Sequence, residues 1–149
     1  DAHRAIRAYE VKLYTKKSIY EWFKMTKSDF EENDFYKIYI DFPRDRLIKR
    51  ISGRVIMMFK KGAIKEVNKF IKLKVPNAKP ANKAIGISEI SDYLNKKLQK
   101  VQVIEKISIK TRQYAKRQAT WARGNMIDWK KIGPDDLNKF LKKIYISRT

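Results

Sequence analysis

Apolar residues recur at helical spacing along most of the chain. Near the start, four apolar side chains at spacings of four, three and four predict one stripe on a helix: Ala2, Ile6, Tyr9 and Leu13. The same periodicity predicts helices over 44–61 and 63–74, with Gly62 as the stop between them. The second of these is expected to turn four side chains inward: Ile64, Val67, Phe70 and Ile71. Further helices are predicted over 100–123 and 134–144.

Two shorter helices have start signals of their own. Ser18 can cap a helix that carries Trp22, and Glu21 lies where its carboxylate can reach back to close a capping box. Ser88 is expected to open another short helix that runs through Leu94.

Two stretches predict strands. The run "FYKIYIDF" (35–42) is dense in aromatic and β-branched residues and stops at Pro43. Because both of its faces are apolar, we expect it in a central, covered position of a sheet. The run "MIDW" (126–129) is predicted as a second, short strand, whereas 27–34 and 75–83 are interpreted as connectors. This order of elements is typical of half of an α/β sheet protein.

Length and charge narrow the classes of protein. The 149 residues suffice for one domain, or one domain with an appendage, and their net charge of +20 attracts polyanions, nucleic acid first of all. No apolar run is long enough to span a bilayer, and no membrane partner is expected. The absence of Cys and the single His argue against a metal site, so no metal-binding residue is assigned. We expect a soluble, cytoplasmic protein. Because the chain begins at Asp1 within an apparent helix, we expect a fragment or a processed chain.

The segment "TRQYAKRQATWARG" (111–124) concentrates basic side chains on the predicted long helix. At about 100° per residue, Arg112, Lys116 and Arg123 share one side of the helix, and Arg117 widens this side into a basic arc. The other side forms an apolar seam of Val103, Ile107, Tyr114 and Trp121. Trp121 is expected in the core.

No acidic residue lies between Ile107 and Ile127. A solvated helix face usually places Glu one turn from Lys, so we interpret the arc as a surface for a polyanion, with a solvated cationic face as the alternative. The Gln residues and Tyr114 could contact unpaired bases of RNA.

A complete catalytic site is missing from the sequence. The five glycines never give the spacing G-x-x-x-x-G-K-[ST] of a phosphate-binding loop. The pair Asp135 and Asp136 is explained by capping of the last helix, next to the positive end of its dipole. We therefore expect no self-contained catalysis.

Four motifs resemble, in the same order, those of the bacterial tRNA dimethylallyltransferases. These are "DAHRAIRAYEV", "RDRLIKRISGRVIMMFKKGAIKEV", "KAIGISEISDYL" and "TRQYAKRQATW", and together they cover about residues 1 to 129. Members of this family attach an isopentenyl group from dimethylallyl diphosphate to N6 of the adenine just 3′ of the tRNA anticodon. Any one motif alone would be weak, whereas four in order are specific.

The resemblance implies roles for single residues. Arg54, the second Arg of the "R-I-x-x-R-V" match, corresponds to the family arginine that contacts the diphosphate, and it is the one catalytic residue assigned. The resemblance also implies a set of tRNA-binding residues: His3, Arg4, Arg7, Lys83, Gly86, Arg112, Lys116, Arg117, Gln118 and Arg123. Two positions depart from the family pattern, since Ile87 replaces a frequent Tyr and Lys83 replaces the Arg of some members.

The family resemblance also implies a fold. We expect an α/β chain that is the C-terminal part of a P-loop kinase-like doubly wound parallel sheet, mostly helical and with about two strands. Residues 1–34 would end the helical tRNA-binding insertion, and 35–149 would belong to the α/β core. The family's phosphate-binding loop and general-base Asp lie in its N-terminal half, so the chain alone is expected to be inactive. Mg²⁺ would be bound in the intact enzyme by ligands outside this chain.

The expected partners are the tRNA anticodon stem-loop and dimethylallyl diphosphate. Domain swapping or dimerisation is also expected, because missing neighbouring strands would leave a sheet edge or apolar helix faces exposed. A non-catalytic basic RNA-binding protein is the alternative, and a ribosomal type of protein is a weaker one.

Overall fold

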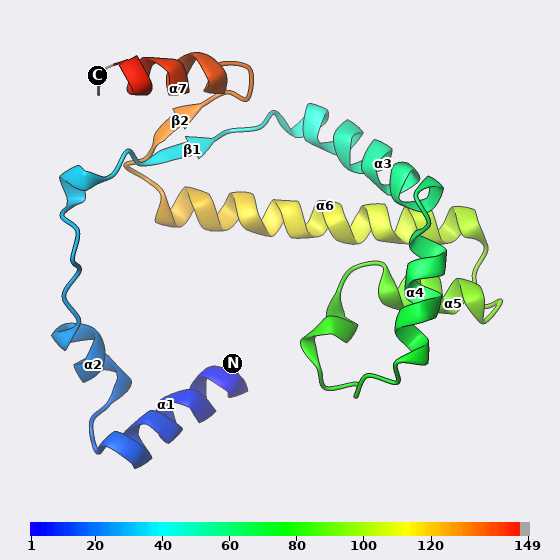
Figure 1. The fold of residues 1–149 in the computed structure, drawn as a ribbon, viewed down its shortest axis with the longest axis horizontal. Coiled ribbons are helices and arrows are strands. Elements are labelled where there is room, and N and C mark those ends of the chain that lie inside the picture. The colour runs from blue at the N-terminus through cyan, green and yellow to red at the C-terminus, as the bar shows by residue number, and fades with distance from the viewer. Residues whose placement is uncertain (147–149) are drawn as a thin grey trace. The chain divides into compact units, whose positions relative to one another are not determined.

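The computed structural model of the chain describes residues 1–146. These residues form two compact units, one of Asp1–Tyr36 and one that begins at Lys37. Figure 1 labels their helices and strands. The first unit is helical, whereas the second contains helices and two short strands.

The first unit contains α1 (Ala2–Thr15), α2 (Ile19–Met25) and the short 3-10 helix η1 (Glu32–Asp34). α1 confirms the helix predicted from the apolar stripe, and Lys16 ends it in the left-handed conformation. No side chain of α1 or α2 is buried. The stripe residues Ile6, Tyr9 and Leu13 are therefore exposed within this unit.

The capping box at the start of α2 is confirmed. The backbone N–H of Ser18 donates to the Glu21 carboxylate at 2.6 Å, and the Glu21 N–H donates to Ser18 Oγ at 3.2 Å. The backbone and side-chain hydrogen bonds from Ser18 lower the pKa of Glu21. The indole N–H of Trp22 donates to Thr15 Oγ1 at 3.0 Å, which ties α2 to the end of α1.

The second unit is built from helices joined by short connections. These are α3 (Arg44–Lys60), α4 (Ala63–Lys72), the 3-10 helix η2 (Pro80–Lys83), α5 (Ile87–Leu94), α6 (Lys100–Asn125) and α7 (Leu137–Ile146). Their bounds confirm the predicted helices to within a few residues. Gly62 adopts φ +100°, a left-handed conformation that suits glycine, and it lets the chain turn sharply from α3 into α4.

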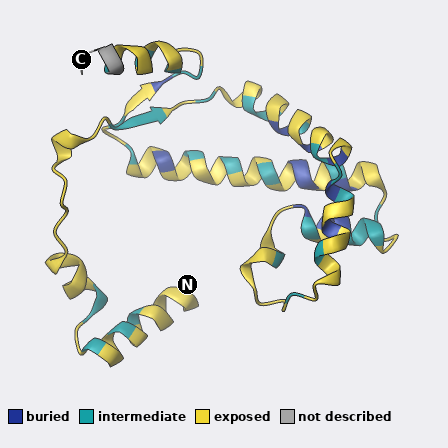
Figure 2. Cartoon of the chain, viewed as in Figure 1, coloured by how far each residue is buried: buried dark blue, intermediate teal, exposed yellow. Residues whose placement is uncertain are grey.

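The core of this unit lies where α3, α4, α5 and the first half of α6 meet (Figure 2). Its buried side chains come from all four helices: Val55, Phe59, Ala63, Val67, Ile90, Val103 and Ile107. The prediction that Ile71 turns inward is wrong, because this side chain is 43% exposed near the end of α4.

The strands β1 (Ile38–Ile40) and β2 (Lys130–Ile132) pair in parallel, with Ile38 opposite Lys130. β1 is shorter than the predicted 35–42. Within residues 1–146 it pairs only with β2, so the expected central, covered position is wrong for the described part of the chain. The strand predicted over 126–129 is also wrong. These residues form a turn, closed by the Trp129 N–H donating to the Met126 carbonyl at 3.4 Å, and β2 follows it.

Asp135 does not cap α7 as the sequence analysis proposed. Its carboxylate instead accepts two hydrogen bonds from the Arg46 guanidinium, at 2.6 and 3.0 Å. The hydrogen bond to Arg46 and the charge of Arg46 lower the pKa of Asp135. This bidentate pair joins the first turn of α3 to the connection between β2 and α7.

Candidate nucleic-acid interface

The C-terminal half of α6 presents the basic surface predicted from the sequence. Five candidate side chains on it are exposed: Arg112, Lys116, Arg117, Gln118 and Arg123. Gln118 is neutral, and none of the other four, which are cations, has a carboxylate within 4.0 Å among the described residues. The Arg117 guanidinium lies 5.8 Å from the centre of the Tyr114 ring, which steadies it without neutralising its charge. The surface is thus unpaired positive charge held on one rigid helix.

The apolar seam of α6 is covered along only part of its length. Val103 and Ile107 are buried against the core, whereas Tyr114 and Trp121 are half exposed. The prediction of Trp121 as a core residue is therefore wrong: its side chain is 59% exposed in this chain. Trp121 instead lines an open depression together with Gln113, Lys116, Arg117 and Thr120.

Gly86 is the point at which the third motif meets the core. It caps α5 with φ +110°, and it is buried. A Cβ atom at this position would lie 3.7 Å from Ile107 Cδ1 of α6 and 3.8 Å from Met58 Cε of α3. The loop that carries Lys83 and Gly86 therefore packs between two helices. The predicted start of α5 at Ser88 is displaced, since Gly86 rather than Ser88 is the capping residue.

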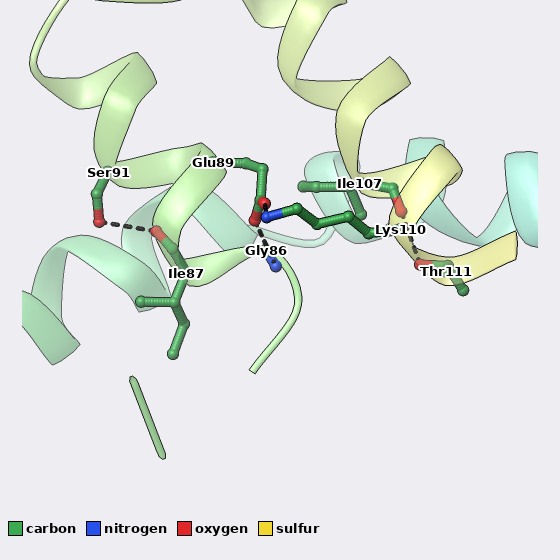
Figure 3. A network of polar contacts seen from close by, with 7 residues as sticks. All are labelled: Gly86, Ile87, Glu89, Ser91, Ile107, Lys110 and Thr111. Atoms are coloured by element: carbon green, nitrogen blue, oxygen red, sulfur yellow. Dashed lines mark hydrogen bonds and ion pairs between the residues drawn. The ribbon is translucent and has the colours of Figure 1, made fainter. Parts of the chain in front are cut away.

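Glu89 and Lys110 fasten this loop to α6 (Figure 3). The Glu89 carboxylate accepts a hydrogen bond from the Gly86 N–H at 2.9 Å and forms an ion pair with Lys110 Nζ. Glu89 is only 3% exposed, so it is a buried charge that Lys110 neutralises. The sequence analysis did not single out either residue for this role. The one signal for it is the spacing of three between Gly86 and Glu89, which is that of a capping box.

The pKa of Glu89 is lowered in spite of its burial. Burial acts to raise it, because a buried carboxylate loses its hydration. The hydrogen bond from Lys110, the backbone N–H groups of Glu89 and Gly86, and the charge of Lys110 act together to lower it, and they outweigh burial. Glu89 therefore stays ionised at neutral pH and keeps the loop attached to α6.

Arg54 lies on α3, one helical turn before Met58. Its side chain is exposed and has no carboxylate within 4.0 Å among the described residues. Met58 follows it by one helical turn on the same side of α3, and Met58 is the side chain that approaches Gly86. The packing thus brings together the helix of Arg54, the Gly86 loop and α6, which carry three of the four sequence motifs.

The candidate residues His3, Arg4 and Arg7 belong to the other compact unit. All three are exposed on α1. Arg4 lies 3.6 Å from the Asp1 carboxylate and Arg7 lies 3.6 Å from the Glu10 carboxylate. Such exposed pairs are weak, about 0 to 1 kcal/mol, and they can be exchanged for phosphate contacts.

Neither a cluster of metal-ligating side chains nor a membrane-spanning helix occurs in the described part of the chain. Within residues 1–146, no three His, Cys, Asp or Glu side chains gather so that they could hold a metal ion. No helix in this range is both long and apolar enough to cross a membrane.

Comparison with known sequences gives a consistent family. The family model for IPP transferase matches residues 1–125. A tRNA dimethylallyltransferase of Pelagibacter ubique is 49% identical over 144 residues, which are 97% of this chain and 46% of that relative. One of Ehrlichia canis is 40% identical over 121 residues, which are 81% of this chain and 40% of that relative. The chain thus spans less than half the length of these curated relatives.

Solved structures agree with the sequence relatives. The tRNA delta(2)-isopentenylpyrophosphate transferase of Staphylococcus epidermidis matches with a TM-score of 0.69 and 28% identity, over 98% of this chain and 48% of that one. The full-length tRNA isopentenylpyrophosphate transferase of Bacillus halodurans matches with a TM-score of 0.65 and 30% identity, over 85% and 42%. These likenesses confirm the expected fold class, a mostly helical part of a P-loop kinase-like α/β fold with two parallel strands. By its sequence motifs, its fold and its relatives, the chain belongs to the IPP transferase family.

Proposed function

We propose that this chain is the part of a tRNA dimethylallyltransferase that holds the tRNA and the departing diphosphate. The relatives named tRNA dimethylallyltransferase support tRNA modification by prenyl transfer, and they do not favour the alternative of a non-catalytic RNA-binding protein. The partners are then tRNA, through its anticodon stem-loop, and dimethylallyl diphosphate. The surface of α6 supports the first of these partners, because exposed and unpaired cations bind a phosphate backbone.

The proposed reaction moves one dimethylallyl group. The adenine N6 forms a bond to C1 of that group, the bond from C1 to the diphosphate oxygen breaks, and N6 loses one proton. Arg54 stabilises the diphosphate as negative charge builds on its oxygens, since a guanidinium offers a planar pair of donors and stays charged. The proton acceptor in this proposal is the Asp of the family's N-terminal half, and Mg²⁺ is likewise held by residues outside this chain.

One observation carries the proposal: Gly86 packs against both the helix of Arg54 and the basic helix. Met58 of α3 and Ile107 of α6 both approach it, and Glu89 holds it in place. A diphosphate site on α3 and a tRNA surface on α6 are thereby built on one rigid part of the chain. In this proposal residues 1–34 are the end of the tRNA-binding insertion, and they would add His3, Arg4 and Arg7 to the tRNA contacts.

A chimeric enzyme tests this function. The corresponding segment of the Pelagibacter ubique relative is replaced by this chain, and transfer is measured with radiolabelled dimethylallyl diphosphate and tRNA. We expect transfer by the chimera, and a loss of about 100-fold or more in kcat when Arg54→Ala removes the donor to the diphosphate. Lys49→Ala, an exposed cation on the same helix, is the matched control and should leave kcat unchanged. A folded chimera that binds tRNA but transfers nothing would contradict the proposal.

A further inference from the structure

A second positive surface lies on α4, away from the residues discussed so far. Lys65, Lys69 and Lys72 fall within about 60° of one another around this helix. The buried residues Ala63 and Val67 lie on the opposite side, at about 160° to 200° from Lys65. The three lysines therefore form one solvent-facing strip, here called the lysine face.

The lysine face has one acidic neighbour in the sequence, Glu66, which forms no ion pair with its three lysines in the described part of the chain. All three side chains are exposed, and within residues 1–146 none has a carboxylate within 4.0 Å. The surrounding segment 60–83 contains eight Lys and a single acidic residue, Glu66. A helix surface that serves only for solubility usually pairs Lys with Glu one turn away. This one concentrates cations, which repel one another until an anion binds.

The chemistry of the lysine face fits a phosphate backbone. Lys offers a compact, mobile ammonium rather than the planar fork of Arg, so it neutralises phosphates without reading bases. An anionic membrane is the other possible sink, but a helix that lies in a membrane inserts its apolar side. The apolar side of α4 is occupied, since Ala63 and Val67 are buried in the core. Nucleic acid is therefore the favoured ligand.

The lysine face lies apart from the basic surface of α6. α4 packs against α3 and α5, and its buried Ala63 and Val67 share one core with Val103 and Ile107 in the first half of α6 (Figure 1). Lys116 and Arg123 follow Ile107 by nine and sixteen residues, or about 14 to 24 Å along the axis of α6. The phosphates that the two surfaces bind are therefore different ones, at least about 14 Å apart along the RNA.

We propose that the lysine face contacts the phosphate backbone of the same tRNA outside the anticodon stem-loop. This inference rests on the proposed function, because it takes tRNA as the substrate. The two surfaces then bind different parts of the tRNA: the surface of α6 binds the loop that is modified, and the lysine face of α4 contacts phosphates without recognising bases. The second contact favours whole tRNA over short hairpins.

Binding of two RNAs by the 149-residue chain tests the inference. Affinities for whole tRNA and for its isolated anticodon stem-loop are measured against salt for the wild type and for the triple variant Lys65→Gln, Lys69→Gln and Lys72→Gln. Each lost phosphate contact lowers the slope of log K against log salt by about 0.9. For whole tRNA we expect the slope of the triple variant to be smaller than that of the wild type by about 2.7. When the salt concentration rises from about 50 to about 200 mM, the wild type should then lose on the order of 40-fold more affinity for tRNA than the variant loses. For the stem-loop we expect no change.

A matched triple variant separates position from charge alone. Lys139→Gln, Lys142→Gln and Lys143→Gln remove three exposed lysines from α7 and should leave both slopes unchanged. Equal losses from the two triple variants, an equal loss for both RNAs, or no binding of either RNA by the wild type would overturn the inference. Tighter binding of the wild type to anionic vesicles than to tRNA would also overturn it. Arg54→Ala in the chimera tests the proposed function separately, since transfer to the stem-loop does not depend on α4.

Discussion

Replacing Glu89 with Ala removes the fastening between the Gly86 loop and α6. In the wild type, the Glu89 carboxylate accepts the Gly86 N–H at 2.9 Å and pairs with Lys110. After the substitution, the buried Gly86 N–H has lost its acceptor and Lys110 its partner. The two interactions differ in weight, because Gly86 is buried whereas the Lys110 side chain is 53% exposed.

The expected cost can be worked out from this geometry. A buried N–H without an acceptor costs about 1 to 3 kcal/mol. The half-exposed Lys110 can regain water, so the loss of its ion pair adds about 1 kcal/mol or less. We therefore expect Glu89→Ala to lower the free energy of unfolding by about 1 to 4 kcal/mol. Glu89→Gln retains a side-chain oxygen that can accept the Gly86 N–H, and it should cost about 1 kcal/mol.

Urea denaturation of the 149-residue chain, followed by circular dichroism, measures this difference. Glu105→Ala on α6 is the control, because Glu105 is exposed and should change the free energy of unfolding by no more than about 0.5 kcal/mol. If Glu89→Ala were as stable as Glu105→Ala, the contact between the Gly86 loop and α6 would not depend on Glu89, and the reasoning would be refuted.

Three further predictions concern pH, glycine and assembly. The folded pKa of Glu89 lies below the ordinary value of 4.5, so the stability that its carboxylate contributes is present above that pH and is lost as the pH falls. Wild type should therefore lose more stability than Glu89→Gln between about pH 5 and pH 3. Equal losses of the two proteins in urea titrations would be inconsistent with this. Gly86→Ala should destabilise the fold by about 1 to 2 kcal/mol because of the positive φ of Gly86. Gly53→Ala, inside α3 with open space around it, should stabilise the fold by about 0.5 to 1 kcal/mol. Thermal melts that give both changes the same sign would count against this conformational argument. The chain should dimerise, by domain swapping or through its exposed sheet edge or apolar helix faces; light scattering checks this, and a monomer at all concentrations would show the expectation to be wrong.

Local signals predicted most of the helices. The periodicity of α1, α3 and α6 and the capping box of Ser18 with Glu21 depend on residues within one or two turns, which a sequence shows directly. β2 could not be placed in this way. Its residues include Lys130 and Lys131, which have no strong strand preference, and pairing with β1 alone defines it.

The misjudged residues share a dependence on distant neighbours. Periodicity placed Trp121 on the apolar side of α6, but whether an element covers that side depends on where α3 and α5 end. The pair of Glu89 and Lys110 joins two helices, so it appears only once α5 and α6 are packed. Asp135 likewise seemed to be a capping residue, and its partner Arg46 lies 89 positions away.

Detection of the modified base tests the central claim most directly. The chimera that carries this chain is expressed in cells without their own tRNA dimethylallyltransferase, and their tRNA is digested and analysed by mass spectrometry. We predict a dimethylallyl group on the adenine immediately 3′ of the anticodon, and its loss with Arg54→Ala. A folded, expressed chimera whose tRNA carries no such group, or an Arg54→Ala variant that modifies tRNA as fully as the unchanged chimera, would contradict the account.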